Sequence, residues 1–171
     1  MLNQNLKPLL VIVFLIAAWL NMTAVQAESY GKPVQVKLST DLYQDAQLAR
    51  EKGVPIVVMF SQDGCGYCGI IREQFLKPML RSGDYKNKAI IREVKIDTFE
   101  DVRDFNGKQV PSDELSTIHR AYLTPTVVVF DSNGKAHHRI LGVVNEHYYG
   151  GELDDAIDMA YSQINRVAAN N

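Results

Sequence analysis

The pattern of hydrophobic and polar positions predicts strands along most of the chain. Residues 34–38 alternate apolar and polar side chains, as a half-buried strand does. Residues 55–60 form a continuous apolar run rich in β-branched side chains, which is typical of a strand buried on both faces of a sheet. Two later runs have the same character, and we expect strands at residues 89–97 and 126–130.

Helical patterns separate these runs. One helix is predicted to run to Lys52, with Ser39, Thr40 and Asp41 as N-cap candidates and Gly53 as its stop. A second is predicted to begin near Cys65, because apolar side chains then recur every four residues. Proline lacks a backbone donor and clashes with the preceding turn, so we expect Pro78 to kink this helix or end it.

The last third of the chain predicts a helix, a hairpin and another helix. Ser112 is expected to cap a short helix that runs to about Arg120. Residues 131–134 form a tight-turn signal between the strand at 126–130 and a partner strand at 135–141. One apolar face marks a C-terminal amphipathic helix, and its members are Leu153, Ala156, Ile157, Ala160, Ile164, Val167 and Ala168.

This order of elements predicts an α/β fold with a central mixed sheet and helices on both faces. The chain has 171 residues, of which 46% are hydrophobic, and no internal repeat or linker divides it, so we expect one folded domain over residues 28–171. The formal net charge is -2 and no basic block occurs, which argues against nucleic acid as a partner.

The N-terminal 27 residues have the pattern of a signal peptide. Lys7 precedes an apolar run over residues 9–20, and Ala27 ends a small-residue cleavage signal. An uncleaved anchor is the alternative, but the run is shorter than the roughly 20 residues that span a bilayer. We therefore expect export, cleavage near Ala27, a periplasmic location and no stable membrane association afterwards.

The two cysteines of the chain, Cys65 and Cys68, are separated by two residues. This spacing places both sulfurs at the first turn of a helix, where free backbone N–H groups and the helix dipole favour a thiolate. A bond that closes so short a loop constrains the unfolded chain very little, so a purely structural disulfide is a poor explanation. We interpret the pair as a redox-active dithiol in which Cys65 reacts first.

A zinc site is the alternative use of such a pair. It would need two histidines near the cysteines, from among His119, His137, His138 and His147. His137 and His138 are adjacent on a predicted strand and point to opposite faces, so at most one could join. We expect no metal and no organic cofactor.

Three features together resemble the thioredoxin superfamily. They are Cys65-Gly66-Tyr67-Cys68 between a strand and a helix, Thr124-Pro125-Thr126 at the start of a later strand, and Gly142 after the hairpin. The resemblance covers roughly residues 34–167 and implies a thioredoxin-like fold. Within the superfamily, the chain is most similar to exported proteins of the sulfur-oxidation (SoxW-like) type.

The resemblance implies a role for each matching residue. Cys65 would attack a substrate disulfide and Cys68 would resolve the mixed disulfide. Pro125 would be the cis-proline of the family, with Thr124 facing the sulfurs, and a trans proline that starts the strand is the alternative. With Gly66 and Tyr67, these two residues would contact substrate. Protein substrates, and a redox partner that resets the dithiol, are the implied partners.

Two positions depart from the family pattern. A buried acid would be expected six residues before Cys65, where this chain has Met59, and a lysine four residues before Asp97, where it has Glu93. One hypothesis is that Glu93 accepts the proton of Cys68. The alternative is that Glu93 lies solvated at the end of the sheet.

The sequence favours a reductase of protein disulfides. A disulfide isomerase, an oxidant and a non-catalytic peptide-binding module are the alternatives, and the direction of electron flow is left open. Isomerases with a similar Gly-Tyr pair work as dimers through a separate N-terminal domain, for which this chain has no room, so we expect a monomer. Gly64, Tyr67 and Tyr122 could form an apolar rim for partners, or the tyrosines could be half-buried packing residues.

Overall fold

The computed structural model describes residues 33–98 and 100–169. In its first half the elements are β1 (Lys37–Leu38), α2 (Leu42–Lys52), β2 (Ile56–Ser61), α3 (Gly66–Ile71), the π-helical turn η1 (Arg72–Leu76), α4 (Lys77–Ser82), the 3-10 turn η2 (Asp84–Asn87) and β3 (Ile90–Lys95). In the second half they are β4 (Asp101–Arg103), β5 (Gln109–Pro111), α5 (Ser112–Ile118), β6 (Thr126–Phe130), β7 (Ala136–Leu141) and α6 (Glu146–Ala169).

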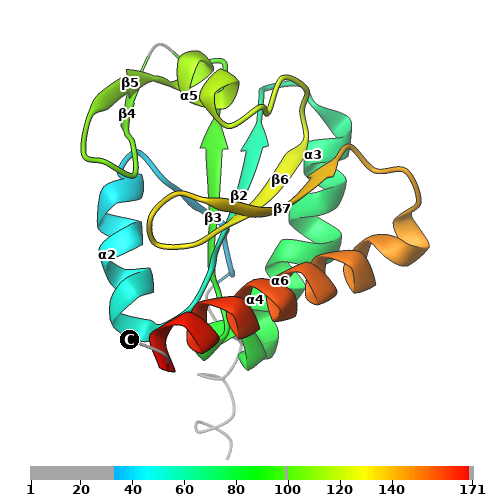
Figure 1. Cartoon of the computed structure of the whole chain (residues 1–171). Coiled ribbons are helices and arrows are strands. Elements are labelled where there is room, and N and C mark those ends of the chain that lie inside the picture. The colour runs from blue at the N-terminus through cyan, green and yellow to red at the C-terminus, as the bar shows by residue number, and fades with distance from the viewer. Residues whose placement is uncertain (1–32, 99, 170–171) are drawn as a thin grey trace, which may run out of the picture. The chain divides into compact units, whose positions relative to one another are not determined.

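The main sheet has five strands in the order β1-β3-β2-β6-β7 (Figure 1). β1, β3 and β2 run parallel, whereas β6 is antiparallel to β2, and β7 is antiparallel to β6. β2 lies at the centre, and all six of its residues are buried, as its continuous apolar run predicts. The predicted mixed sheet is therefore confirmed, and the expected hairpin forms its antiparallel edge.

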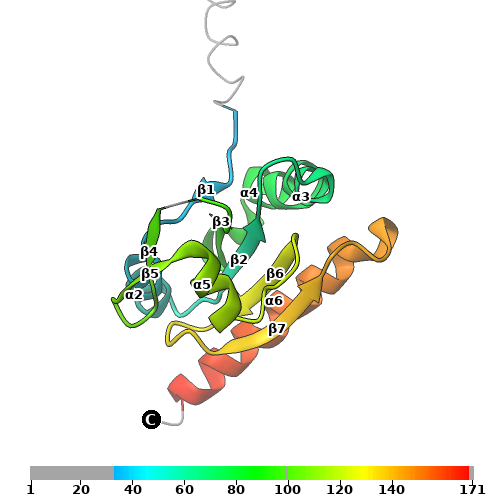
Figure 2. The same ribbon diagram turned by 90° about the horizontal axis from the view of Figure 1, so that it is seen from above.

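Helices cover both faces of the sheet (Figure 2). α2 and α5 pack on one face, where Leu42 and Leu115 meet Phe60 in one apolar cluster. α3, α4 and α6 pack on the other face, where Ile71 and Leu153 join a second cluster. Successive side chains of β2 point to opposite faces of the sheet and join the two clusters in turn, so each face of the central strand has its own core.

The helix caps follow the sequence at α2. Asp41 Oδ1 accepts a hydrogen bond of 2.8 Å from the Gln44 N–H, and Gly53 ends the helix at φ 66°, as predicted. The prediction that Ser112 caps α5 is wrong, because Pro111 occupies the N-cap and Ser112 is the first helical residue. The Ser112 hydroxyl instead donates to the Thr98 carbonyl at 3.0 Å, which ties α5 to the segment after β3.

Three other expectations change in detail. Of the predicted strand 34–38 only Lys37–Leu38 pairs with β3. Pro78 does not end the helix, which continues to Ser82, and the turn before it widens to the π-helix η1. Val167 is exposed, because the 24 residues of α6 span about 36 Å whereas five strands span only about 20 Å. The side chain of Ala168 lies outside the described part of the chain.

The segment after β3 forms a second, smaller sheet. Its two strands, β4 and β5, pair antiparallel on either side of Asn106-Gly107. Arg103 connects this small sheet to α2, because its guanidinium lies 4.5 Å from the centre of the Tyr43 ring.

The predicted signal peptide, residues 1–27, lies outside the described residues. Its cleavage and the resulting location stay predictions. Within residues 33–98 and 100–169, no helix combines the length and the apolar character needed to cross a membrane.

Candidate active site

The dithiol lies where the central strand ends. β2 finishes at Ser61, a short loop follows, and Cys65 occupies the N-cap position of α3. Gly64 takes a positive φ of 71°, a conformation that favours glycine, and it turns the loop into the helix. Cys65 and Cys68 are joined by a disulfide with their Cα atoms 5.3 Å apart, so the structure shows the oxidised pair.

The two sulfur atoms have different surroundings. Cys65 is partly exposed, whereas Cys68 is only 1% exposed. The backbone N–H of Cys68 donates to Cys65 Sγ at 3.1 Å, so Cys65 occupies the cap position that a serine or aspartate side chain fills in other helices. Helical structure then continues without a break through α3, η1 and α4 to Ser82. Cys65 is therefore the more exposed cysteine of the pair, and it lies at a helix end, where the backbone N–H groups and the dipole favour a thiolate.

The Thr124–Pro125 segment comes to the same end of β2. Thr126, the first residue of β6, pairs with Phe60, next to the last residue of β2. The Thr124–Pro125 peptide bond is cis, and the Pro125 carbonyl accepts a 2.8 Å hydrogen bond from the Gly142 N–H. Antiparallel pairing of β2 with β6 thus brings this segment beside the loop that carries Cys65.

Exposed apolar side chains accompany these residues in the sequence. Tyr67 is 58% exposed, Tyr122 is 66% exposed and Leu123 is 63% exposed. The alternative that the two tyrosines are half-buried packing residues is therefore wrong. Leu123 was not singled out from the sequence, although its place directly before Thr124-Pro125 would have suggested it.

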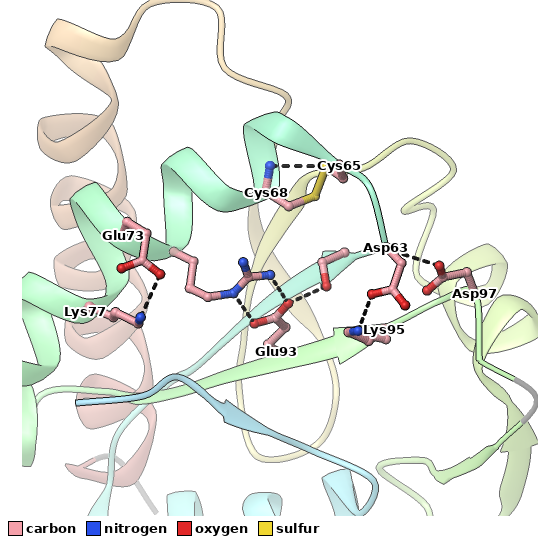
Figure 3. Close-up of polar contacts among 10 residues, drawn as sticks. Asp63, Cys65, Cys68, Glu73, Lys77, Glu93, Lys95 and Asp97 are labelled. Carbon is pink, nitrogen blue, oxygen red and sulfur yellow. Dashed lines mark hydrogen bonds and ion pairs between the residues drawn. A yellow bond between two sulfur atoms is a disulfide. The ribbon is translucent and has the colours of Figure 1, made fainter. Parts of the chain in front are cut away.

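Glu93 lies below the dithiol and not in solvent (Figure 3). It is only 2% exposed, so the expectation of a solvated residue at the sheet end is wrong. Parallel pairing places Glu93 beside Met59 on the sheet. Its carboxylate accepts hydrogen bonds from Ser61 Oγ at 2.5 Å and from Arg72 Nε at 2.8 Å and Nη2 at 2.5 Å.

These partners keep Glu93 ionised. Burial alone would raise the pKa of the carboxyl, but the hydrogen bonds from Arg72 and Ser61, with the positive charges of Arg72 and Lys95, hold the pKa below its usual value. The same pairing raises the pKa of the Arg72 guanidinium, mainly through its hydrogen bond to Glu93.

Sequence reasoning missed Arg72 and Ser61. Both carry a positional signal, because Arg72 lies four residues after Cys68 on a helix and Ser61 lies two residues after Met59 on a strand. Each therefore shares a face with a residue that was singled out. The signal becomes specific only when β3 is known to place Glu93 between them.

A second set of contacts holds the loop before Cys65. The Asp63 carboxylate forms an ion pair with Lys95, and the Asp63 N–H donates to Asp97 Oδ2 at 2.7 Å (Figure 3). A pocket of about 450 Å³ opens beside this loop, and its wall includes Cys65, Arg72 and Glu93. Cys65 and the Arg72–Glu93 ion pair therefore border one pocket that is open to solvent.

The histidines do not gather at the dithiol. His119 packs among aromatic rings, with its centroid 4.8 Å from Phe130 and 5.5 Å from Phe105. His137 lies on β7 and contacts Asp131 Oδ2 at 3.0 Å. Among the described residues, no group of three or more His, Cys, Asp or Glu side chains is arranged to hold a metal ion.

Comparison with known proteins places the chain in a family. The profile of the thioredoxin-like domain matches residues 42–157, whereas no curated protein sequence matches the chain. Among solved structures, a thioredoxin from Nicotiana alata, NaTrxh, is 18% identical, with 77% of this chain and 97% of that chain covered and a TM-score of 0.52. A poplar thioredoxin h, PtTrxh4, is 19% identical, with 73% and 98% covered and a TM-score of 0.51.

Identities this low establish the fold alone. The family match and the disulfide-bonded Cys65–Cys68 pair together support thiol–disulfide oxidoreductase activity at the general level. On the profile match over residues 42–157, the chain belongs to the thioredoxin-like domain family.

Proposed function

We propose that this protein is an exported thiol–disulfide oxidoreductase that reduces disulfide bonds in other proteins. The difference between the two sulfurs carries the proposal. Cys65 is accessible at a helix N-terminus and accepts a backbone N–H, whereas Cys68 is buried directly behind it. This is the arrangement that separates an attacking cysteine from a resolving one.

The proposed reaction has two exchange steps. The Cys65 thiolate attacks one sulfur of the substrate disulfide, a Cys65–substrate bond forms, and the other substrate sulfur leaves as a thiolate that takes up a proton. Cys68 then loses its proton and attacks the sulfur of Cys65, which releases the second substrate sulfur. The substrate gains two electrons and two protons, and the domain is left with the Cys65–Cys68 disulfide seen in the structure.

An extended segment of the substrate would dock beside the dithiol. The exposed Tyr67, Tyr122 and Leu123 offer apolar contacts, and the Thr124–Pro125 segment offers backbone groups at the start of β6. Gly66, between Tyr67 and Cys65, adds no side chain that would block the approach. A polypeptide substrate fits this surface better than a small molecule does, because the apolar groups are spread along it and do not enclose a cavity.

The remaining parts of the proposal rest on the sequence pattern. Lys7, the apolar run over residues 9–20 and Ala27 support export to the periplasm with the leader removed. A second redox protein would then return the Cys65–Cys68 disulfide to the dithiol after each turnover, with the domain acting as a monomer.

Reduction of insulin disulfides by the purified protein with dithiothreitol tests the activity. We expect the Cys65→Ser variant to lose the catalysed rate entirely. The Cys68→Ser variant should accumulate a covalent mixed disulfide with substrate, visible on a non-reducing gel, because nothing resolves it. Full activity in Cys65→Ser, or no adduct with Cys68→Ser, would contradict the proposed order of attack.

The reduction potential of the pair decides the direction of electron flow. Equilibration with glutathione, followed by quantifying the reduced and oxidised protein, gives this potential. A value near that of thioredoxin, about -270 mV, is expected for a reductase, whereas a value near -120 mV would make the protein an oxidant.

A further inference from the structure

The Glu93 carboxylate beneath the dithiol has hydrogen-bond partners on both of its oxygens. Both oxygens of the Glu93 carboxylate are occupied, because Oε1 accepts from Ser61 Oγ and Arg72 Nη2 while Oε2 accepts from Arg72 Nε. A carboxylate held by three charge-assisted or buried hydrogen bonds is a poor proton acceptor, since protonation would break them. These hydrogen bonds therefore favour a role for Glu93 as a permanently charged partner of Arg72 over a role as a proton carrier.

Arg72 contacts Glu93 from the helical segment that carries the cysteines. It lies one turn after Cys68, on the π-helical turn η1, and its side chain is 27% exposed. Arg72, Glu93 and Cys65 border the same 450 Å³ pocket. Arg72 thus contacts the buried carboxylate and borders a pocket that Cys65 also borders, and Figure 3 shows Glu93 below the turn that carries both cysteines.

We propose that the Arg72–Glu93 pair is a positioning device that sets the stability of the Cys65 thiolate, in place of the titrating acid that Met59 has replaced. In this arrangement the Arg72 charge favours the thiolate and the Glu93 charge opposes it. Glu93, which itself accepts a hydrogen bond from Ser61, holds Arg72 in place. The inference rests on the proposed function only in assigning the attack to Cys65.

Other charges nearby bear on this balance. Glu73 lies beside Arg72 on η1, and the loop and β3 contribute Asp63, Lys95 and Asp97. Lys95 pairs with Asp63, and Glu73 pairs with Lys77 at 2.6 Å, so much of their charge is already balanced. Asp63 and Lys95 also line the pocket of Cys65, but their side chains are 76% and 31% exposed, so water screens this pair more than it screens Arg72 and Glu93, which are 27% and 3% exposed.

The test measures the thiolate of Cys65 without any substrate protein. In a Cys68→Ser background Cys65 is the single thiol, and its rate of alkylation by iodoacetamide against pH gives its pKa. Below that pKa the rate follows the thiolate fraction, so one unit of pKa changes the rate about tenfold. Each variant is compared with this background protein.

The two charges are expected to act in opposite directions. Arg72→Met should slow alkylation at low pH by about threefold to tenfold, because a cation is lost and a buried carboxylate remains. Glu93→Gln should speed it, because the guanidinium is left unopposed. The double variant should return close to the background rate, since it removes one charge of each sign.

Lys88→Met is the matched control. Lys88 also pairs with two carboxylates, Asp154 at 2.9 Å and Asp158 at 2.7 Å, but it lies before the opposite end of β3. The variant removes one positive charge and breaks ion pairs that are more exposed than that of Arg72, and it should leave the alkylation profile unchanged.

Several outcomes would overturn the proposal. If Arg72→Met and Glu93→Gln shift the pKa of Cys65 in the same direction, the effect comes from packing only. If their shifts are no larger than that of Lys88→Met, the charge pair has no effect on the thiolate. A second ionisation in the profile that disappears in Glu93→Gln would make Glu93 a proton carrier. If Arg72→Met does not fold, Arg72→Lys and the double variant carry the test, with Arg72→Lys expected to lie between the background and the slow limit.

Failure of the proposed function would look different. Loss of insulin reduction in the unmodified protein, with opposite alkylation shifts intact, would leave the charge pair standing and remove only the reductase assignment. Unchanged alkylation in all three variants, with insulin reduction abolished by Cys65→Ser, would remove the charge pair and leave the reductase.

Discussion

At the scale of single residues, some positions are restricted by tertiary contacts that cannot be predicted from the sequence. Gly134, in the turn between β6 and β7, has a positive φ of 77°. A Cβ at this position would lie 2.7 Å from Cγ of Phe105, in the segment between β4 and β5. The turn signal in residues 131–134 predicts a glycine there, but the close approach of a segment about 30 residues earlier comes only from the tertiary fold.

Gly134→Ala is therefore expected to destabilise the domain. Left-handed backbone costs an alanine about 1–2 kcal/mol, and the contact with Phe105 adds to it, so we expect a loss of roughly 1–3 kcal/mol in the free energy of unfolding, measured by urea denaturation. Gly151→Ala is the control, because Gly151 lies within α6 and a Cβ there would meet no atom of another element within 4 Å. It should gain about 0.5–1 kcal/mol, and a loss in both variants would contradict the argument.

The residues of the candidate site divide by how they are recognised. Cys65 and Cys68 could be predicted from spacing alone, since cysteines separated by two residues have few uses besides redox chemistry and metal binding. Glu93 could be named but not interpreted, because whether a carboxyl on a strand is solvated depends on what lies over it. The Arg72 side chain lies over the Glu93 carboxylate and comes from another element. The ion pair therefore forms only when the helix that carries the cysteines packs against β3.

At the scale of elements, the sequence predicts what local chemistry determines. The continuous apolar run of β2 and the two caps of α2 are as expected, because each depends on residues close in sequence. The widened turn η1 is different. A π-helical turn has i→i+5 backbone hydrogen bonds, such as that from the Lys77 N–H to the Arg72 carbonyl, and nothing in the side-chain pattern of Arg72–Leu76 distinguishes it from an ordinary helix.

The packing of α6 gives a prediction at this scale. Leu153 is fully buried against the sheet, so Leu153→Ala should lower the free energy of unfolding by about 2–5 kcal/mol through lost burial and the cavity left behind. Met159, on the same helix, is 51% exposed, and Met159→Ala should change it by less than about 0.5 kcal/mol. Thermal or urea unfolding of both variants checks this, and equal losses would mean that α6 does not pack by this face.

At the scale of the whole molecule, the sheet order explains why the fold class and the dithiol could be predicted from the sequence but the Arg72–Glu93 ion pair could not. Strand types and their sequence order follow from periodicity, whereas the order β1-β3-β2-β6-β7 decides which side chains meet. Met59 and Glu93 are 34 positions apart in the chain and become neighbours only through the pairing of β2 with β3. No pattern within either strand contains that information.

Stability of the whole domain should depend on pH through His119. Burial lowers the pKa of this imidazole in the folded protein, and the nearby charge of Arg139 lowers it further, although Asp104 opposes this. The unfolded chain takes up the proton near the usual pKa of 6.5, before the folded protein does. The unfolded state therefore binds more protons below that pH, and the free energy of unfolding should fall as the pH is lowered from about 7.5 to 5.5.

Urea denaturation at both pH values measures this fall. His119→Gln is expected to be less stable at pH 7.5, because it disturbs the contacts with Phe105 and Phe130, but its stability should change less between the two pH values. Retention of the full pH dependence in the variant would assign the effect to another group.

The pairing of Phe60 with Thr126 has one further consequence, which concerns the order in which the site is synthesised and folds. The cysteines are synthesised early, whereas the segment that lies beside them follows about 60 residues later, and long-range pairings of this kind form late in folding. A nascent chain thus holds both thiols before it holds a complete site. Under the proposed function, selective exchange with a substrate therefore requires that β6 has already paired with β2.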